Sequence, residues 1–170
     1  MRQAVVTARL RLVPVGPGHV EDLVELHAHP DVAFWHNGAW SWGRARAFAE
    51  SMAHRWRVEG AGKWMAYERG SGALVGRGGL SFAAVEGVRR LEVGWTVHPR
   101  MQRRGFAVEI GAAGLALAFG GLGAAEVVAF TEPQNTASRA VMRRLGMGGA
   151  RPIVLRGAPF VLYTVAAPGA

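Results

Sequence analysis

The sequence predicts a single α/β domain of the α+β type, in which helices flank a mixed, mostly antiparallel sheet. The chain has 170 residues, half of them hydrophobic, which suits one domain with a sizeable core. Three strand-like segments joined by short turns indicate an antiparallel meander. A helical segment between two further strand-like segments indicates a crossover that pairs them in parallel. We therefore expect the order βααβββαβαββ within one domain spanning residues 1–170.

The first part of the chain predicts one strand and two helices. Residues 8–15 alternate apolar and charged side chains, as a half-buried strand does. Residues 19–29 carry apolar side chains at helical spacing, and Pro30 is expected to stop that helix. Residues 31–42 are aromatic and loop-like. A second helix is expected over residues 43–59.

The middle of the chain predicts the meander and the crossover. Its three strands are expected at residues 63–69, 73–84 and 89–97. A helix follows from Ala107 to about Phe119, with Gly111 and Gly114 inside it. Each of these glycines costs about 1 kcal/mol relative to alanine, which close packing onto a sheet or a ligand would offset.

The last part of the chain predicts three strands and one helix. Residues 126–131 read as a short buried strand, parallel to the strand at residues 89–97. Asn135 can cap a helix that Gly146 terminates. The segments 152–156 and 159–165 read as a final hairpin.

The join between the strand at 89–97 and the following helix predicts an anion site. It reads RMQRRGFAVE over residues 100–109, with arginine at positions 100, 103 and 104. The first turn of a helix has free N–H groups and a positive dipole end, and Gly105 allows close backbone approach. The Walker loop and the Gly-x-Gly-x-x-Gly fingerprint are both absent.

The composition limits the choice of partners. The formal net charge is +8, which suits nucleic acid or a phosphorylated ligand. The basic residues are spread along the chain, which argues against nucleic acid. The chain has no cysteine, so it can have neither disulfides nor a cysteine nucleophile.

Metal binding and membrane insertion are not expected. The acidic and histidine side chains at positions 27, 29, 31 and 36 have spacings that do not align them on a helix face. No apolar run approaches the roughly 18 residues that a spanning helix needs. Residues 1–6 lack the features of a signal peptide, so a cytoplasmic location is expected.

A tryptophan cluster leaves two interpretations open. These side chains could line a pocket for an acceptor, or they could pack in the core and its loops, which is the commoner outcome. They are Trp35, Trp40, Trp42, Trp56 and Trp64.

Four short motifs, in this order, resemble the GNAT superfamily of N-acetyltransferases and its RimJ/RimL-type branch, which is ribosomal-protein-alanine N-acetyltransferase-like. The likeness covers nearly the whole chain. The motifs are TARLRL at 7–12, EVGW at 92–95, QRRGFAVE at 102–109, and NTAS at 135–138 followed by LGM at 145–147.

The resemblance implies acetyl-CoA as a cosubstrate. Its pantetheine arm would enter a cleft between strands 91–97 and 126–131, beside Asn135, with Ser138 near the sulfur. The strand residues implied at this site are Trp95, Thr96 and Val97, one of whose N–H groups could polarise the thioester carbonyl. The residues implied to hold the pyrophosphate are Gln102, Arg103, Arg104, Gly105, Phe106 and Ala107.

The chain departs from the family at one catalytic position. Many members have a tyrosine acid seven residues after the asparagine, where this chain has Met142. Ser138 is therefore the candidate that supports the leaving thiolate, unless it only caps its helix. Glu92 is the candidate base, with a structural role as its alternative. Glu109, in the first turn of its helix, is interpreted as structural.

The expected function is transfer of an acetyl group from acetyl-CoA directly to a primary amine, since no cysteine can carry it. The acceptor is either a protein or peptide N-terminus or a small-molecule amine, and the sequence does not separate them. The acceptor site is expected at residues 31–42 and the C-terminal hairpin. The C-terminal strands could exchange between subunits of a homodimer. The alternative from another class is a basic nucleic-acid-binding module without catalysis.

Overall fold

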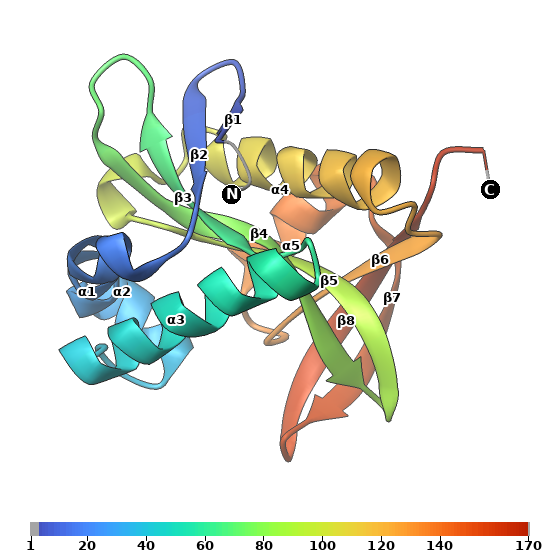
Figure 1. Cartoon of the computed structure of the whole chain (residues 1–170). Helices are drawn as coiled ribbons and strands as arrows, with labels where there is room; N and C mark the ends of the chain where they lie inside the picture. The colour runs from blue at the N-terminus through green and yellow to red at the C-terminus, as the bar shows by residue number, and fades with distance from the viewer. Residues whose placement is uncertain (1–3, 170) are drawn as a thin grey trace.

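The computed structural model describes residues 4–169. The first three of the residues considered as a signal peptide therefore lie outside the described residues. The structure has the expected fold class, a mostly antiparallel sheet flanked by helices (Figure 1). The sheet order is β1-β2-β3-β4-β5-β6-β8-β7. The strands are β1 (Val5–Val6), β2 (Leu10–Pro14), β3 (Lys63–Glu68), β4 (Leu74–Val85), β5 (Val88–Val97), β6 (Glu126–Thr131), β7 (Gly148–Leu155) and β8 (Ala158–Ala166).

The helices follow the expected order with one addition. They are α1 (Val20–Ala28), α2 (Pro30–Ala33), α3 (Trp42–Val58), α4 (Phe106–Ala116) and α5 (Thr136–Arg144). A π-helical segment, Leu117–Gly121, extends α4. The expected order omitted β1 and α2. The loop assigned to residues 31–42 was partly wrong, because Pro30 begins the short helix α2 and a 3₁₀ turn, Phe34–His36, follows it. Proline suits the first turn of a helix, where its missing N–H has no intrahelical partner anyway.

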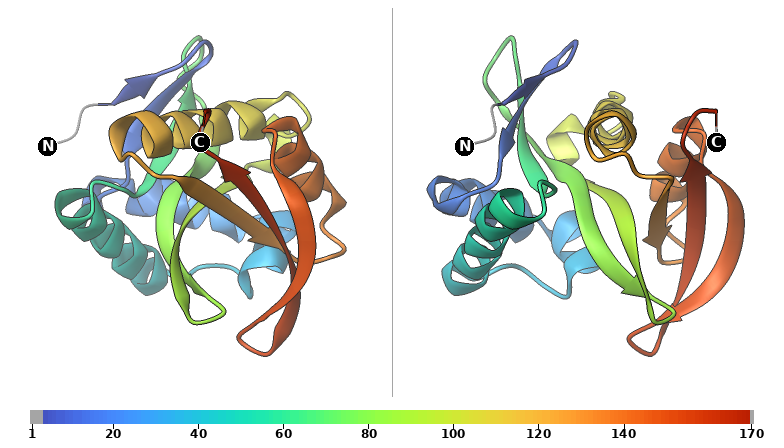
Figure 2. Two further views of the ribbon diagram at one scale, coloured as in Figure 1. Left: turned by 90° about the vertical axis from the view of Figure 1, so that its right-hand side faces the viewer. Right: turned by 45° about the vertical axis from the view of Figure 1, so that its right-hand side comes forward.

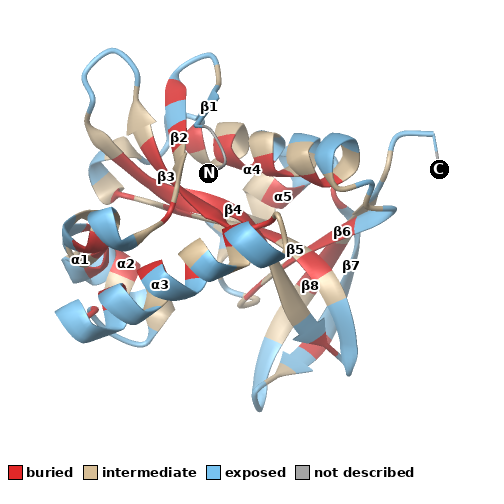
Figure 3. Ribbon diagram, viewed as in Figure 1, coloured by how far each residue is buried: buried red, intermediate tan, exposed pale blue. Residues whose placement is uncertain are grey.

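The helices cover opposite faces of the sheet. Helix α4 packs on β4 and β5, where Ile110 lies over Gly78 and Gly114 lies against Val93. A Cβ on Gly114 would lie 2.9 Å from Val93 Cγ2, which confirms the close packing expected of this helix. Helices α1 and α3 cover the other face through a cluster that includes Met65 of β3. The middles of the central strands are buried between these layers (Figure 3).

Strands β5 and β6 are parallel, as expected, and they pair over a very short stretch. Glu92 and Val128 are the residues in register among those described. At the start of the two strands Arg90 binds Glu126 at 2.8 Å, and near the hairpin tips Arg151 binds Glu86 at 2.6 Å. The sheet is thus joined at this end and diverges toward the ends of β5 and β6, as Figure 2 shows.

Candidate active site

The loop between β5 and α4 presents unpaired backbone N–H groups to solvent. Arg103 and Gly105 have positive φ angles of 60° and 82°, which turn the chain sharply before α4 begins at Phe106. Within residues 4–169, the N–H groups of Arg103, Arg104 and Gly105 have no hydrogen-bond acceptor. Together with the free N–H groups of the first helical turn, they form a cradle suited to phosphate oxygens.

The three arginines of the loop are not equivalent. Arg100 lies 3.3 Å from Glu25, and Arg104 lies 2.7 Å from Glu68. Arg103 has no ion pair among the described residues. It therefore has a guanidinium left to meet a ligand, a distinction that the sequence does not reveal.

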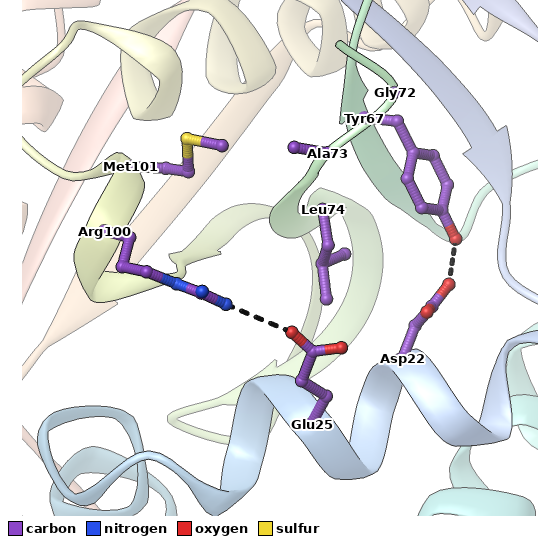
Figure 4. A pocket seen from close by; sticks show the side chains of 8 residues that line it. All are labelled: Asp22, Glu25, Tyr67, Gly72, Ala73, Leu74, Arg100 and Met101. Carbon is purple, nitrogen blue, oxygen red and sulfur yellow. Dashed lines mark hydrogen bonds and ion pairs between the residues drawn. The ribbon is translucent and has the colours of Figure 1, made fainter.

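A surface groove of about 420 Å³ lies beside this loop, between α1, the β3–β4 hairpin and the turn that carries Arg100 and Met101 (Figure 4). Tyr67 donates its hydroxyl hydrogen to Asp22 on one wall, and Glu25 meets Arg100 on the other. Two carboxylates line this groove, so the candidate anion cradle is the separate surface at residues 103–105.

Glu109 anchors the loop to the N-terminal strands, which agrees with its expected structural role. Its carboxylate accepts hydrogen bonds from Thr7 Oγ1 at 2.6 Å and from the Arg9 backbone and Nε at 2.8 Å. Burial opposes ionisation of Glu109, but these hydrogen bonds outweigh it and lower its pKa. Arg9 also donates to the carbonyl of Arg104 at 2.7 Å, which fixes the loop from outside.

Asn135 and Ser138 lie just after the end of β6. The Asn135 side-chain oxygen accepts a hydrogen bond from the Ser138 N–H at 3.1 Å and caps α5. The cap therefore involves the backbone of Ser138, and no hydrogen bond of its hydroxyl is found within the described residues. The Asn135 amide group also keeps its donor. Met142 is buried, with 2% of its surface exposed.

The last residues of β5 alternate between the two faces of the sheet. Trp95 and Val97 pack with the cluster under α4. Thr96 faces the other side, where its hydroxyl lies 3.1 Å from His36 Nε2. These residues lie beyond Glu92, in the part of β5 that has no paired partner on β6. The His98 N–H pairs with the Val75 carbonyl of β4, and N–H groups alternate in direction along a strand. The N–H groups of Trp95 and Val97 therefore point outward at the opening of the sheet, whereas that of Thr96 points toward β4.

Glu92 belongs to a buried ion pair on the α1–α3 face. Its Oε2 accepts hydrogen bonds from Lys63 Nζ at 3.0 Å and from Ser81 Oγ at 2.6 Å. Lys63 also donates to the carbonyl of Gly79 at 2.9 Å. Burial lowers the pKa of Lys63, and the nearby Glu92 carboxylate opposes that shift. The sequence could not reveal this contact, because Lys63 lies on β3, two strands away from Glu92.

A second polar cluster on this face was missed by the sequence reading. The His27 and Trp40 rings stack at 3.6 Å between centroids, and Arg77 Nε donates to His27 Nε2 at 2.9 Å. Burial, with help from the Arg77 charge, lowers the pKa of His27 to about 2 and that of His36 to about 3. Both rings are therefore neutral at physiological pH. The one available signal was that His27 follows Leu23 and Leu26 on the apolar face of its helix.

The tryptophans and the histidine and acidic side chains singled out in the sequence lie as follows. Trp40, Trp56 and Trp64 are buried, whereas Trp42 is 56% exposed, so the tryptophans do not form a single wall. Across residues 4–169, no three histidine or acidic side chains converge as they would around a metal ion. In the same span, no helix is long and apolar enough to cross a membrane.

Comparison with known proteins identifies a family match. Residues 9–148 match the family of the acetyltransferase (GNAT) domain. A curated relative from Aspergillus fumigatus, FsC-acetyl coenzyme A-N(2)-transacetylase, is 34% identical over 160 residues. That alignment covers 83% of this chain but only 63% of the relative.

Solved structures share the fold. A GNAT-family acetyltransferase structure from Bordetella pertussis has a TM-score of 0.85 and 25% identity, and covers 97% of this chain and 100% of its own. The structure of RimL, a ribosomal α-N-protein acetyltransferase in complex with coenzyme A, has a TM-score of 0.74 and 19% identity, with 98% coverage of each chain. The RimL likeness concerns the fold alone. None of these matches supports the nucleic-acid alternative.

Proposed function

Since this chain belongs to the acetyltransferase (GNAT) family, we propose that it transfers the acetyl group of acetyl-CoA to a primary amine. One observation carries the proposal. The cradle of unpaired N–H groups at residues 103–105 lies directly after β5, the strand that separates from β6 beyond Glu92. A phosphate held at the cradle would leave the rest of an extended ligand to run along the free edge of β5.

The donor site consists of the loop, the free end of β5 and the start of α5. Backbone N–H groups from Arg103 to Ala107 hold the pyrophosphate, and the guanidinium of Arg103 adds charge. The N–H of Gln102, which was also expected here, already donates to the Pro99 carbonyl at 3.2 Å. The pantetheine arm binds beside Trp95, Thr96 and Val97, with Asn135 donating from its amide group. Support comes from the amide donor that the helix cap leaves unused.

The chemistry needs a base, a polarised carbonyl and a stabilised thiolate. The amine nitrogen forms a bond to the thioester carbon, the carbon–sulfur bond breaks, and the amine loses a proton. Glu92 receives that proton through water, and Ser138 donates a hydrogen bond to the departing sulfur. The carboxylate of Glu92 faces Lys63, and the Ser138 hydroxyl is free among the described residues. Acetyl-CoA itself supplies the activated acetyl group.

The acceptor and the branch of the family remain proposals. The Aspergillus fumigatus relative is named as an N(2)-transacetylase, and RimL as a ribosomal α-N-protein acetyltransferase. Either a small amine or a protein N-terminus is compatible with those names, and membership in the RimJ/RimL branch is proposed on the motifs alone. A cytoplasmic location and a homodimer stay predictions.

Calorimetric titration of acetyl-CoA tests the donor site. We expect binding near one molecule per chain, and loss of binding in Gly105→Asp, because a negative charge in this loop would repel the phosphates. Gly105→Asn is the matched control. It places a side chain of the same shape at the same φ of 82° without the charge, so both variants lose about 1–3 kcal/mol of stability from backbone strain.

If Gly105→Asp binds acetyl-CoA as the wild type does, the loop assignment is wrong. Where binding is found, acceptors are then screened by thiol release. The chain has no cysteine, so the protein contributes no background to that assay.

A further inference from the structure

A buried arginine lies on the α1–α3 face without an acidic partner. Arg77 of β4 is only 7% exposed, and its guanidinium lies over the rings of Phe48 at 4.8 Å and Trp40 at 5.2 Å. Its one hydrogen bond among the described residues runs from Nε to His27 Nε2. The two terminal nitrogens of the guanidinium therefore keep their hydrogen-bond donors.

The charge of Arg77 is not balanced nearby. Glu92 is the acidic group that favours its ionisation, but Oε2 of that carboxylate already binds Lys63 and Ser81. Burial dominates and lowers the pKa of Arg77 to about 10, which leaves it positively charged at physiological pH. An unpaired charge in a buried position is costly, so such groups are usually paired or serve a ligand.

The cluster around Arg77 also has more donors than acceptors. Because His27 Nε2 accepts from Arg77, the proton of the neutral His27 ring lies on Nδ1. His27 Nδ1 and Trp40 Nε1 are both buried, and neither has a hydrogen-bond partner within the described residues. A ligand that brings oxygen acceptors would complement a cluster of this kind.

The position of Arg77 links the cluster to the opening of the sheet. Arg77 and Thr96 are paired across β4 and β5, and Thr96 lies in the part of β5 that is unpaired on its other edge. The Thr96 hydroxyl meets His36, which ends the short segment 30–36. In that segment Phe34 is 71% exposed.

We propose that Arg77 binds a carboxylate of the acceptor, so that the acceptors are small amines that carry a carboxylate, such as α-amino acids. This inference rests on the proposed acetyl transfer and names its substrate class. A carboxylate on Arg77 supplies the missing counter-charge and places the attached amine one strand from the opening. A peptide N-terminus lacks a carboxylate next to its amine and does not meet this requirement.

The test compares matched acceptors by thiol release from acetyl-CoA. Each of the twenty amino acids is assayed against its amide, which keeps the amine and side chain but removes the carboxylate charge. For the preferred acceptor we expect kcat/KM to exceed that of its amide by at least about tenfold, mainly through KM. In Arg77→Gln this ratio should fall to near one, whereas Arg77→Lys should keep part of it.

Arg89→Gln is the matched control. Arg89 lies on β5 with its guanidinium 3.5 Å from the Phe82 ring centroid and an ion pair to Glu59, outside the cluster. The same exchange there should leave the acid-to-amide ratio unchanged. If Arg77 only packs between the aromatic rings, Arg77→Gln will lower stability without changing the ratio, and the inference is overturned.

Two outcomes separate this inference from the proposed function. Absence of acetyl-CoA binding to the wild type would reject the proposed function itself. Binding of acetyl-CoA with equal rates on acids and amides, or with turnover on protein N-termini alone, would reject only the role of Arg77.

If Arg77→Gln does not fold, the wild type still decides the matter. Its CoA complex is then titrated with the N-acetyl derivatives of the same amino acids and of their amides. For the preferred acceptor, we expect the N-acetyl amino acid to bind more tightly than the corresponding amide. Equal affinities of acid and amide in every pair would overturn the inference.

Discussion

At the scale of single residues, the three arginines of the loop after β5 differ in whether they have an acidic partner. Arg100 and Arg104 are held by Glu25 and Glu68, and Arg103 is left without an ion pair among the described residues. All three lie next to the same predicted phosphate cradle. Only the residue without a protein partner can give its full charge to a ligand.

We therefore expect Arg103→Ala to weaken acetyl-CoA binding by about tenfold at low salt, since charge-assisted contacts to phosphate contribute about 1.5–3 kcal/mol at most and are screened at the surface. Arg100→Ala should change the affinity much less. Calorimetry at two salt concentrations measures both variants. Equal losses in the two variants would show that the ion pair with Glu25 does not distinguish Arg100 from Arg103.

Glu92→Gln tests the proposed base. Turnover should fall and its pH dependence should change, because the amide cannot accept the proton that the carboxylate accepts. Ser81→Ala is the control, since it removes a hydrogen bond to Glu92 while leaving the carboxylate in place. A pH–rate profile that is the same in Glu92→Gln and in the wild type would leave Glu92 with a structural role only.

At the scale of elements, the glycines of α4 are explained by packing. Gly111 lies against Leu145 and Gly114 against Val93, so the helix runs closer to β5 and α5 than an alanine would allow. The apolar pattern of the sequence identified the helix, and its glycines suggested the close approach. The identity of the partner strand required the structure.

Gly114→Ala should lower the free energy of unfolding by about 1 kcal/mol or more, because the overpacking exceeds the gain in helix propensity. The neighbouring Val93 is 1% exposed and cannot move aside easily. In Gly43→Ala, where the nearest atom to a new Cβ is 3.9 Å away, we expect a gain of about 0.5–1 kcal/mol. Urea unfolding of Gly114→Ala and Gly43→Ala measures both changes in the free energy of unfolding. A stabilised Gly114→Ala would mean that α4 can move away from the sheet.

At the scale of the whole molecule, the buried histidines make stability depend on pH. The pKa of His27 falls from 6.5 to about 2 on folding, because the charged ring would be buried beside Arg77. Below pH 6.5 the unfolded chain binds a proton at this site that the native state does not. His27 therefore contributes full stability above about pH 6.5, and that stability is lost progressively as the pH falls toward 2.

Between pH 6.5 and 5, His27 should lower the free energy of unfolding by up to about 1.4 kcal/mol per pH unit. His36, whose pKa also falls on folding, adds to the slope in the same direction. Urea unfolding at several pH values measures the slope of the free energy of unfolding against pH. His27→Gln should reduce this slope. His54→Gln, a change at an exposed residue of α3, should leave the slope as it is. An unchanged slope in His27→Gln would show that His27 is not the group responsible.

The sequence by itself determined the fold class and nearly all the strands and helices, and it predicted the loop that we propose binds phosphate. These follow from local patterns: the period of apolar residues, the glycine and proline positions, and the motif at residues 102–109. Even the error at residues 31–42 was local, since Pro30 is compatible with either the end or the start of a helix.

Only the tertiary structure decided which side chains meet across the sheet. Lys63, Arg77 and Glu92 come from three different strands, and His27 and Trp40 come from segments that pack over them. Strand register sets these contacts, and register depends on pairing between residues far apart in the chain. No local pattern encodes such pairing. The sequence therefore predicted neither the contact between Glu92 and Lys63 nor the burial of Arg77.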